Sequence, residues 1–216
     1  MVRAALFDFG GVILSSPFEA FARYEHANGL PEGLIRRLNA TNPDDNAWAK
    51  LERSEVGLAG FADLFEAEAR AIGHEVDGRA VIDLLGGEVR PAMVDALRRC
   101  SERLSTAMLT NNFVSGMGDD DVEADPTGRR AQIAQIMDLF DVIVESSKVG
   151  VRKPDPRFYE IACEQLGIEP SEAVFLDDLG VNLKPARAMG MTTIKVVDPD
   201  DAIAELETVV GFSLRG

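Results

Sequence analysis

The sequence predicts an α/β fold in which a parallel sheet carries helices on both faces. Two observations support this prediction: short apolar runs end at polar residues, and amphipathic segments of helical length separate most of those runs. Strands that alternate with helices favour a parallel sheet with right-handed crossovers. The chain has 216 residues, enough for one such core together with a small inserted unit.

The first apolar run covers residues 4–9 (AALFDF) and is followed by Gly10 and Gly11. This pattern predicts a buried strand that ends in a tight turn, because glycine adopts turn conformations without steric cost. An apolar N-terminus can also indicate a secretory signal. Here Asp8 interrupts the apolar run and no small-residue cleavage site follows, so the buried strand is the better interpretation.

Residues 17–87 have a different pattern, which predicts helices joined by short polar breaks. Residues 18–30 and 61–73 place apolar residues at helical spacing, and each segment contains a glycine suited to a helix C-terminus. Residues 42–43 and 54–57 are predicted connections. No segment of this stretch has a clear strand pattern, so we expect it to be helical.

After Pro91 the two kinds of segment alternate. The predicted helices cover residues 91–100, 129–139, 154–167 and 183–190, and the predicted strands cover residues 105–110, 141–146, 173–178 and 192–197. Residues 116–128 are polar and glycine-rich, which predicts a mobile loop with solvated acidic side chains. The remainder of the chain is therefore expected to form the sheet and its covering helices.

Composition excludes several classes of function. The formal net charge of −15 argues against non-specific nucleic-acid binding, because phosphate neutralisation needs clustered lysine and arginine. No apolar run approaches the roughly 20 residues of a membrane helix. Cys100 and Cys163 lie in amphipathic helical patterns, which favours buried thiols over a disulfide. We therefore expect a cytoplasmic protein without nucleic-acid or membrane partners.

Polar residues end three of the predicted strands. Asp8, the pair Thr110 and Asn111, and the pair Asp177 and Asp178 all fall there. Ligands of open parallel sheets bind beyond the carboxyl ends of the strands, so these residues are expected on one edge, the rim. Asp8 could bind a hard cation and attack phosphorus with its free oxygen, which would give an aspartyl-phosphate. The alternative is that Asp8 only caps the glycine turn.

The adjacent carboxylates of Asp177 and Asp178 predict a magnesium site. At the end of a buried strand they repel each other and lose water, so they need a cation or a set of hydrogen-bond donors. Mg²⁺ prefers a few carboxylates together with several waters. The alternative is that one of them caps a helix that begins near Asn182.

Thr110 and Asn111 supply a hydroxyl and an amide, neutral donors suited to phosphoryl oxygens. Ordinary loop hydrogen bonding is the alternative, and Asn112 would replace Asn111 if the strand ended one residue later.

Lys153 immediately precedes Pro154, which disfavours helix at the lysine and leaves it on a loop at a helix entrance. A cation there could balance the carboxylates and an incoming phosphate. Lys148 and Arg152 are nearby alternatives for this role, and a solvent-exposed lysine is the simpler interpretation of Lys153 itself.

Four segments now combine into one pattern: ALFDFGGVIL, AMLTNN, VGVRKPDPRFYE and AVFLDDLGVNLKPARAMGMTTI. In this order they resemble the four motifs of the haloacid dehalogenase (HAD) superfamily, and the resemblance covers essentially the whole chain. It implies a Rossmann-like, three-layer core of residues 1–16 and 88–216 and an inserted helical cap of residues 17–87. The fourth motif and the tail VVDPDDAIAELETVVGF are most similar to the N-terminal phosphatase domain of soluble epoxide hydrolase and its stand-alone bacterial relatives.

The resemblance also implies a role for each motif residue. Asp8 would be the nucleophile and a magnesium ligand, and Lys153 would hold nucleophile and phosphoryl group together. Thr110 and Asn111 would bind phosphate. The metal would further be bound by Asp178 and the Gly10 carbonyl, with Asp177 acting through water or as a supporting residue.

Gly10 departs from the phosphatase pattern, which has a second aspartate at this position as general acid–base. Glycine keeps the carbonyl but cannot move a proton, and such proton transfer is typically worth about 10²–10⁴-fold in rate. The candidate substitutes are Asp177, a cap residue, metal-bound water, or a leaving group that needs little protonation.

Three interpretations follow from this departure. The first is a magnesium-dependent phosphatase that hydrolyses a small phosphorylated metabolite with a substitute acid. The second is a catalytically impaired HAD-fold protein with a binding or regulatory role. The third is a 2-haloacid dehalogenase, since those enzymes lack the second aspartate; they also dispense with magnesium, so the pair Asp177 and Asp178 argues against this interpretation.

Substrate selection is expected in the cap, because a cap closes over the rim and excludes water. Trp48 and Arg53 are the candidates for substrate binding. The alternatives are that Trp48 belongs to the cap core and that Arg53 forms a surface ion pair with a neighbouring glutamate. A compact cap suits a small phosphometabolite, and the resemblance to epoxide hydrolase adds lipid phosphates. The protein could be a monomer or a homodimer.

Overall fold

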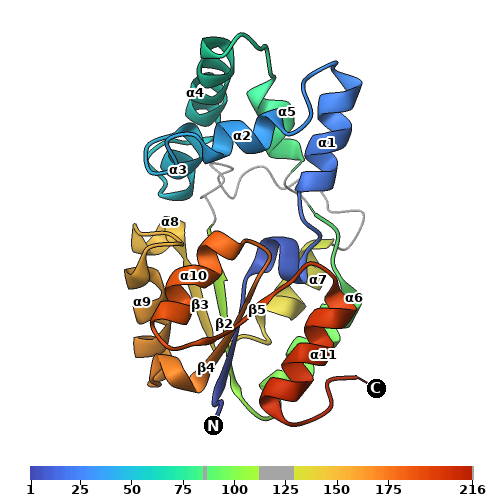
Figure 1. Ribbon diagram of the computed structural model, residues 1–216, viewed down its shortest axis with the longest axis vertical. Coiled ribbons are helices and arrows are strands. Elements are labelled where there is room, and N and C mark those ends of the chain that lie inside the picture. Colours follow the sequence, from blue (N-terminus) through green and yellow to red (C-terminus); the bar gives the residue numbers. More distant parts are fainter. Residues whose placement is uncertain (85–86, 112–128, 216) are drawn as a thin grey trace.

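The computed structural model describes residues 1–84, 87–111 and 129–215. Within them, five strands form one sheet in the order β3–β2–β1–β4–β5, and every neighbouring pair is parallel (Figure 1). The strands are β1 (Ala4–Phe7), β2 (Ser105–Thr110), β3 (Val142–Glu145), β4 (Ala173–Asp177) and β5 (Thr192–Lys195). The prediction of a parallel α/β sheet is therefore confirmed.

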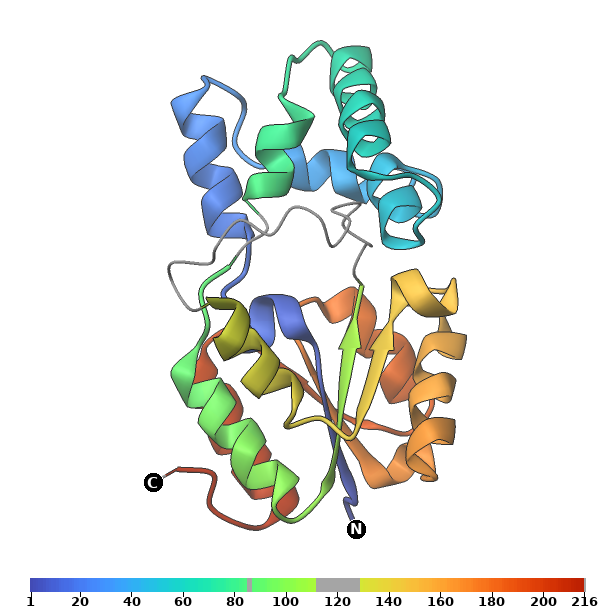
Figure 2. The same ribbon diagram turned by 180° about the vertical axis from the view of Figure 1, so that it is seen from behind.

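Helices cover both faces of the sheet because the strands are apolar on both sides. In β1, Ala5 and Phe7 pack towards one face, while Ala4 and Leu6 pack towards the other. The first face is covered by α6 (Pro91–Ser101), α7 (Arg129–Met137) and α11 (Pro199–Val210). The second is covered by α9 (Pro156–Leu166) and α10 (Gly180–Ala188), with the short α8 (Ser146–Val149) after β3 (Figure 2). This gives the predicted three-layer core.

Four strands end one or two residues earlier than predicted, namely β1, β3, β4 and β5, and the ends of β1 and β4 position acidic residues. β1 ends at Phe7, because the Asp8 side chain accepts a hydrogen bond from the Phe9 amide and starts a turn over Phe9–Ile13. β4 ends at Asp177, which leaves Asp178 in the following loop. Asp8 and Asp178 thus stand just beyond the strands, on the rim.

Five helices gather beyond the rim and form a helical layer (Figures 1 and 2). They are α1 (Phe18–Ala27), α2 (Leu34–Ala40), α3 (Ala47–Glu52), α4 (Leu58–Ala71) and α5 (Gly78–Asp83). The layer has an apolar cluster of its own, in which the Trp48 ring packs against Phe61 and Phe65. The all-helical pattern agrees with the sequence, while the division of the chain into core and cap domains stays a prediction.

The segments that enter and leave the helical layer run side by side. The Ser15 amide donates to the Glu88 carbonyl at 2.7 Å, and the Arg90 amide donates to the Ile13 carbonyl at 2.9 Å. The two crossings are therefore hydrogen-bonded to each other, and the layer joins the core through a pair of adjacent backbone segments.

The structure also bears on the expectations for the two cysteines and for membrane helices, whereas two other expectations concern residues that it does not describe. Cys100 and Cys163 are free and buried, as predicted. No helix of the described chain is long and apolar enough to cross a membrane. The predicted loop over residues 116–128 and the alternative residue Asn112 both lie outside the described residues.

We predict that Gly78→Ala destabilises the packing of α5 against α4. A Cβ atom at Gly78 would lie 2.6 Å from the Ala62 Cα and 2.8 Å from the Ala62 carbonyl oxygen, and a backbone cannot swing aside as a side chain can. Urea unfolding should show a loss of about 1–3 kcal/mol in the free energy of unfolding. Gly180→Ala is the matched control, since Gly180 is likewise the first residue of its helix, α10, and a Cβ there meets nothing within 4 Å. Equal stability of the two variants would contradict the packing described.

Candidate active site

Lys153 lies at the centre of the rim and is 1% exposed. Its Nζ is 2.8 Å from Asp8 Oδ2 and 2.7 Å from Asp177 Oδ2. Burial alone would lower the pKa of this ammonium group, but the two carboxylates outweigh burial and raise the pKa. Lys153 therefore carries its charge inside the protein, and the interpretation as a solvent-exposed lysine is wrong.

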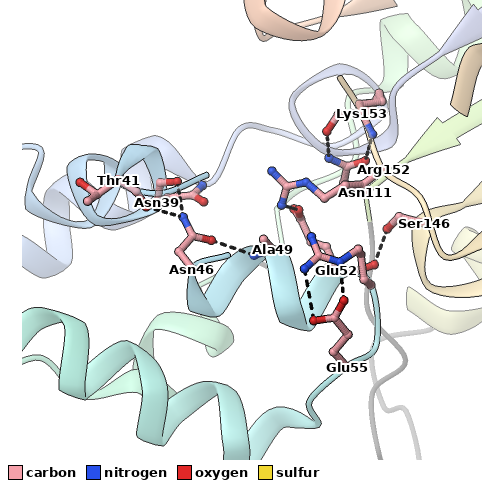
Figure 3. Close-up of polar contacts among 11 residues, drawn as sticks. Asn39, Thr41, Asn46, Ala49, Glu52, Glu55, Asn111, Ser146, Arg152 and Lys153 are labelled. Carbon is pink, nitrogen blue, oxygen red and sulfur yellow. Dashed lines mark hydrogen bonds and ion pairs between the residues drawn. The ribbon is translucent and has the colours of Figure 1, made fainter. Parts of the chain in front are cut away.

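Asn111 fixes the backbone of Lys153. Its Oδ1 accepts a hydrogen bond of 2.9 Å from the Lys153 amide, and its Nδ2 donates one of 3.0 Å to the Lys153 carbonyl (Figure 3). Asn111 thus joins the end of β2 to the segment before α9. Thr110 and Asn111 both line the pocket at the rim. Asn111 can therefore position Lys153 and still make the predicted contact to phosphate.

Asp177 is fully buried, and its carboxylate is occupied on both oxygens. Both oxygens accept hydrogen bonds of 3.0–3.1 Å from the side-chain amide of Asn182. Oδ1 also accepts one from the backbone amide of Leu179, and Oδ2 forms an ion pair with Lys153. Asp177 does not line the pocket. This carboxylate therefore supports Lys153 and the start of α10, which argues against Asp177 as the proton donor that the sequence left open.

Asp8 and Asp178 face the pocket. One oxygen of Asp8 accepts from the Phe9 amide at 2.6 Å while the other pairs with Lys153. Asp178 Oδ2 accepts a 3.3 Å hydrogen bond from the Ser16 hydroxyl. Burial is the main reason that the pKa of each carboxyl is raised, and the neighbouring charge of Asp177 adds to it. Two carboxyl groups are thus held close together with too little positive charge around them.

Asp8, Asp177 and Asp178 fit the requirements of a divalent cation. One oxygen from each of the three carboxylates lies within 4.8 Å of the others, and the Lys153 ammonium pairs with two of them, Asp8 and Asp177. A dication would balance the charge that Lys153 leaves. Asp8, Asp178 and Gly10 line the pocket, which suits Mg²⁺ because it takes one or two carboxylates and keeps several waters. Asp177, with both oxygens hydrogen-bonded, fits a supporting role.

Gly11 brings the turn after Asp8 against Asp178. Its φ of +80° belongs to the left-handed region, and a Cβ atom there would lie 2.3 Å from Asp178 Cγ. Any side chain at this position would push the carboxylate out of place. Gly10 is different, because its φ is −72° and a Cβ atom would meet nothing within 4 Å.

A pocket of about 270 Å³ lies at the rim, and the helical layer supplies part of its wall. The layer contributes Phe18, Phe21, Asn39, Trp48 and Glu52 to the lining. Trp48 therefore belongs both to the pocket and to the core of the layer. Arg53 does not line the pocket; it forms an ion pair with Glu55 at 2.6 Å, as the alternative interpretation held.

Glu52 and Asn182 were not found by sequence reasoning. The Glu52 side chain forms an ion pair with Arg152, and the Glu52 carbonyl accepts a hydrogen bond of 2.6 Å from the Ser146 hydroxyl (Figure 3). These contacts join α3 to the core across about 100 residues of sequence, so no local pattern marks them. Asn182 gives a weak signal, a polar residue on the buried side of α10.

Comparison with known proteins identifies the family of this chain. A sequence model of haloacid dehalogenase-like hydrolases matches residues 2–190. The chain is 36% identical to Acyl-CoA dehydrogenase family member 10 of Mus musculus and 34% identical to Bifunctional epoxide hydrolase 2 of Sus scrofa, in each case over 99% of its length. It spans only 20% and 40% of those two proteins.

Proteins of similar length also match. A sesquiterpene phosphatase of Aspergillus oryzae is 39% identical, with 97% of each chain covered. Among solved structures, a HAD-family enzyme of Bacteroides thetaiotaomicron in complex with magnesium and inorganic phosphate superposes with a TM-score of 0.58 at 18% identity. The superposition covers 90% of this chain and 94% of that one. The chain therefore belongs to the haloacid dehalogenase-like hydrolases.

Proposed function

We propose that this hydrolase is a magnesium-dependent phosphatase that acts on a small phosphate monoester through an aspartyl-phosphate at Asp8. The observation that carries the proposal is the position of Asp8, whose carboxylate faces the pocket, pairs with Lys153 and lies beside Asp178. The name of the Aspergillus oryzae relative and the magnesium and phosphate bound to the Bacteroides thetaiotaomicron enzyme support the same reaction class.

The residues divide the reaction between them. Asp8 attacks phosphorus with a carboxylate oxygen, and the bond to the leaving oxygen breaks on the opposite side. Lys153 holds Asp8 and offers positive charge to the phosphoryl oxygens, which Thr110 and Asn111 contact as neutral donors. Bound by Asp8, Asp178 and the Gly10 carbonyl, Mg²⁺ would neutralise phosphoryl charge. Water then hydrolyses the aspartyl-phosphate and restores Asp8.

The pocket favours a substrate with an apolar alcohol part. Its lining includes the apolar residues Phe18, Phe21 and Trp48 from the helical layer and Leu14 and Leu179 from the rim, together with the polar Asn39 and Glu52 of the layer. We propose that the layer acts as a cap that holds this apolar group and excludes water. A prenyl or short alkyl phosphate fits such a wall better than a sugar phosphate, whose hydroxyl groups would lose their water without enough partners.

We predict that Asp8→Asn abolishes phosphatase turnover. The amide keeps the shape of the side chain but is a poor nucleophile, so kcat for p-nitrophenyl phosphate with Mg²⁺ should fall by about 10³-fold or more. Asp63→Asn, an exposed position on α4, is the control and should retain the wild-type rate. Full activity of Asp8→Asn would refute the nucleophile.

We predict that Mg²⁺ raises the unfolding temperature of the wild-type protein and not that of Asp178→Asn. At ten times its dissociation constant the ion should stabilise the fold by about 1.4 kcal/mol, a rise of several degrees. Calorimetry in Mg²⁺ and in EDTA measures this without any substrate. Asp177→Asn should instead lower stability in both conditions, because Lys153 would lose a buried partner. Equal stabilisation of wild type and Asp178→Asn would contradict the site.

We predict a preference for apolar esters. With Mg²⁺, kcat/KM for a prenyl phosphate should exceed that for glucose 6-phosphate by at least about tenfold, because two buried methylene groups alone contribute about 1.6 kcal/mol. Phe18→Asn should reduce this ratio, whereas Ile72→Asn, at an exposed apolar position outside the pocket, should not. A higher kcat/KM for the sugar phosphate would overturn the preference and leave the reaction class untouched.

A further inference from the structure

The proposed reaction needs a proton donor that Gly10 cannot supply. An alcohol leaves phosphorus readily only when its oxygen receives a proton, and Gly10 has no side chain to give one. Asp177 is excluded because it is buried, fully hydrogen-bonded and outside the pocket. Asp8 is the nucleophile and Asp178 a metal ligand in the proposed function. Among the residues that the structure describes, the remaining carboxyl group in the pocket lining belongs to Glu52.

Glu52 lies on the side of the pocket where the leaving oxygen must be. In-line displacement places the leaving group opposite the attacking oxygen. Asp8 attacks from the rim, so the leaving oxygen points towards the helical layer, and Glu52 is the last residue of α3 in that layer (Figures 1 and 3). Its backbone is tied to the core by Ser146, which keeps the end of α3 over the site.

The surroundings of Glu52 suit a group that gives up a proton and takes it back. Burial raises the pKa of this carboxyl, and the positive charges of Arg152, Lys153 and Arg53 oppose that rise without cancelling it. An acid whose pKa is raised towards the working pH is the better proton donor. Arg152, ion-paired with Glu52, stabilises the carboxylate that remains after the proton has left.

We propose that Glu52 is the general acid–base of this site and replaces the side chain that Gly10 lacks, an inference that rests on the proposed phosphatase function. When Asp8 attacks phosphorus, the bond to the leaving oxygen breaks, its electron pair stays on that oxygen, and the oxygen takes the proton of Glu52. When water attacks the aspartyl-phosphate, the Glu52 carboxylate takes a proton from the water. The sum is one ester and one water converted into alcohol and phosphate.

Two esters that differ in their leaving groups test this assignment. The p-nitrophenolate ion can leave phosphorus without receiving a proton. The butoxide of n-butyl phosphate leaves readily only when its oxygen is protonated. Glu52→Gln should lower kcat/KM for n-butyl phosphate by about 10²–10⁴-fold and change kcat/KM for p-nitrophenyl phosphate by less than about threefold. The ratio kcat/KM is compared because it reports formation of the aspartyl-phosphate and not its later hydrolysis, in which Glu52 acts as the base for both esters. The wild-type rate with n-butyl phosphate should also decline at alkaline pH, where Glu52 loses its proton, and Glu52→Gln should lack this decline.

Three variants separate proton transfer from structure. Arg152→Gln breaks the same ion pair but keeps the acid, so it should retain n-butyl phosphate hydrolysis and shift the alkaline decline to higher pH. Glu68→Gln removes another carboxyl group of the helical layer, one that lies outside the pocket and whose pKa is also raised by burial. This variant should hydrolyse both esters at the wild-type rates. Gly10→Asp, where a Cβ atom meets open space, should restore part of the rate lost in Glu52→Gln.

The outcomes distinguish this inference from the proposed function. If Glu52→Gln changes kcat/KM of the two esters equally, or changes neither, Glu52 is not the acid, while Asp8-dependent hydrolysis of p-nitrophenyl phosphate still supports the phosphatase. If Arg152→Gln reproduces the selective loss of n-butyl phosphate hydrolysis, the ion pair and not the proton is responsible, and the assignment falls. If the wild type hydrolyses neither ester, the proposed function and the inference are both overturned.

Discussion

The site depends on one buried ammonium group shared by two carboxylates. Lys153 is almost inaccessible to water, so its charge is tolerated only because Asp8 and Asp177 lie within 2.8 Å of it. Asp8 follows β1, Asp177 ends β4, and Asn111 ties the Lys153 backbone to the end of β2. The ion pair therefore forms only when the ends of three strands and the loop before α9 are correctly placed relative to one another. The same placement brings the residues of the pocket together.

The rim could be predicted from the sequence because its geometry follows from topology. Parallel strands end on one edge, so Asp8, Thr110 and Asp178 meet there in any fold with these strands. The division of labour within the acidic pair depended on individual hydrogen bonds. Asp177 is buried, with both of its oxygens bonded to Asn182 and Lys153. The sequence alone does not reveal which of two adjacent aspartates is buried in this way and which faces the pocket.

The contribution of the helical layer could be predicted only in part. Trp48 was identified because a single tryptophan beside a polar break is conspicuous, and it lines the pocket. Arg53 was equally plausible from its position, yet its guanidinium pairs with Glu55 two residues away. Its neighbour Glu52 lines the pocket instead, and its contacts are with Arg152 and Ser146 of the core. These two adjacent residues differ because Arg53 has a local partner, whereas the partners of Glu52 lie far away in sequence.

The two glycines after Asp8 have different physical reasons to be glycine. Gly11 is required by the backbone, since it has a positive φ and Asp178 occupies the space of a Cβ atom. Gly10 has an ordinary φ and open space beside it, so neither the turn nor the packing forbids a side chain there. A proton donor on α3 instead of on the rim would be in place only while the helical layer covers the pocket. The reaction and the exclusion of water would then depend on the same arrangement, in which the Ser146 hydroxyl, bonded to the Glu52 carbonyl, keeps the end of α3 over the pocket.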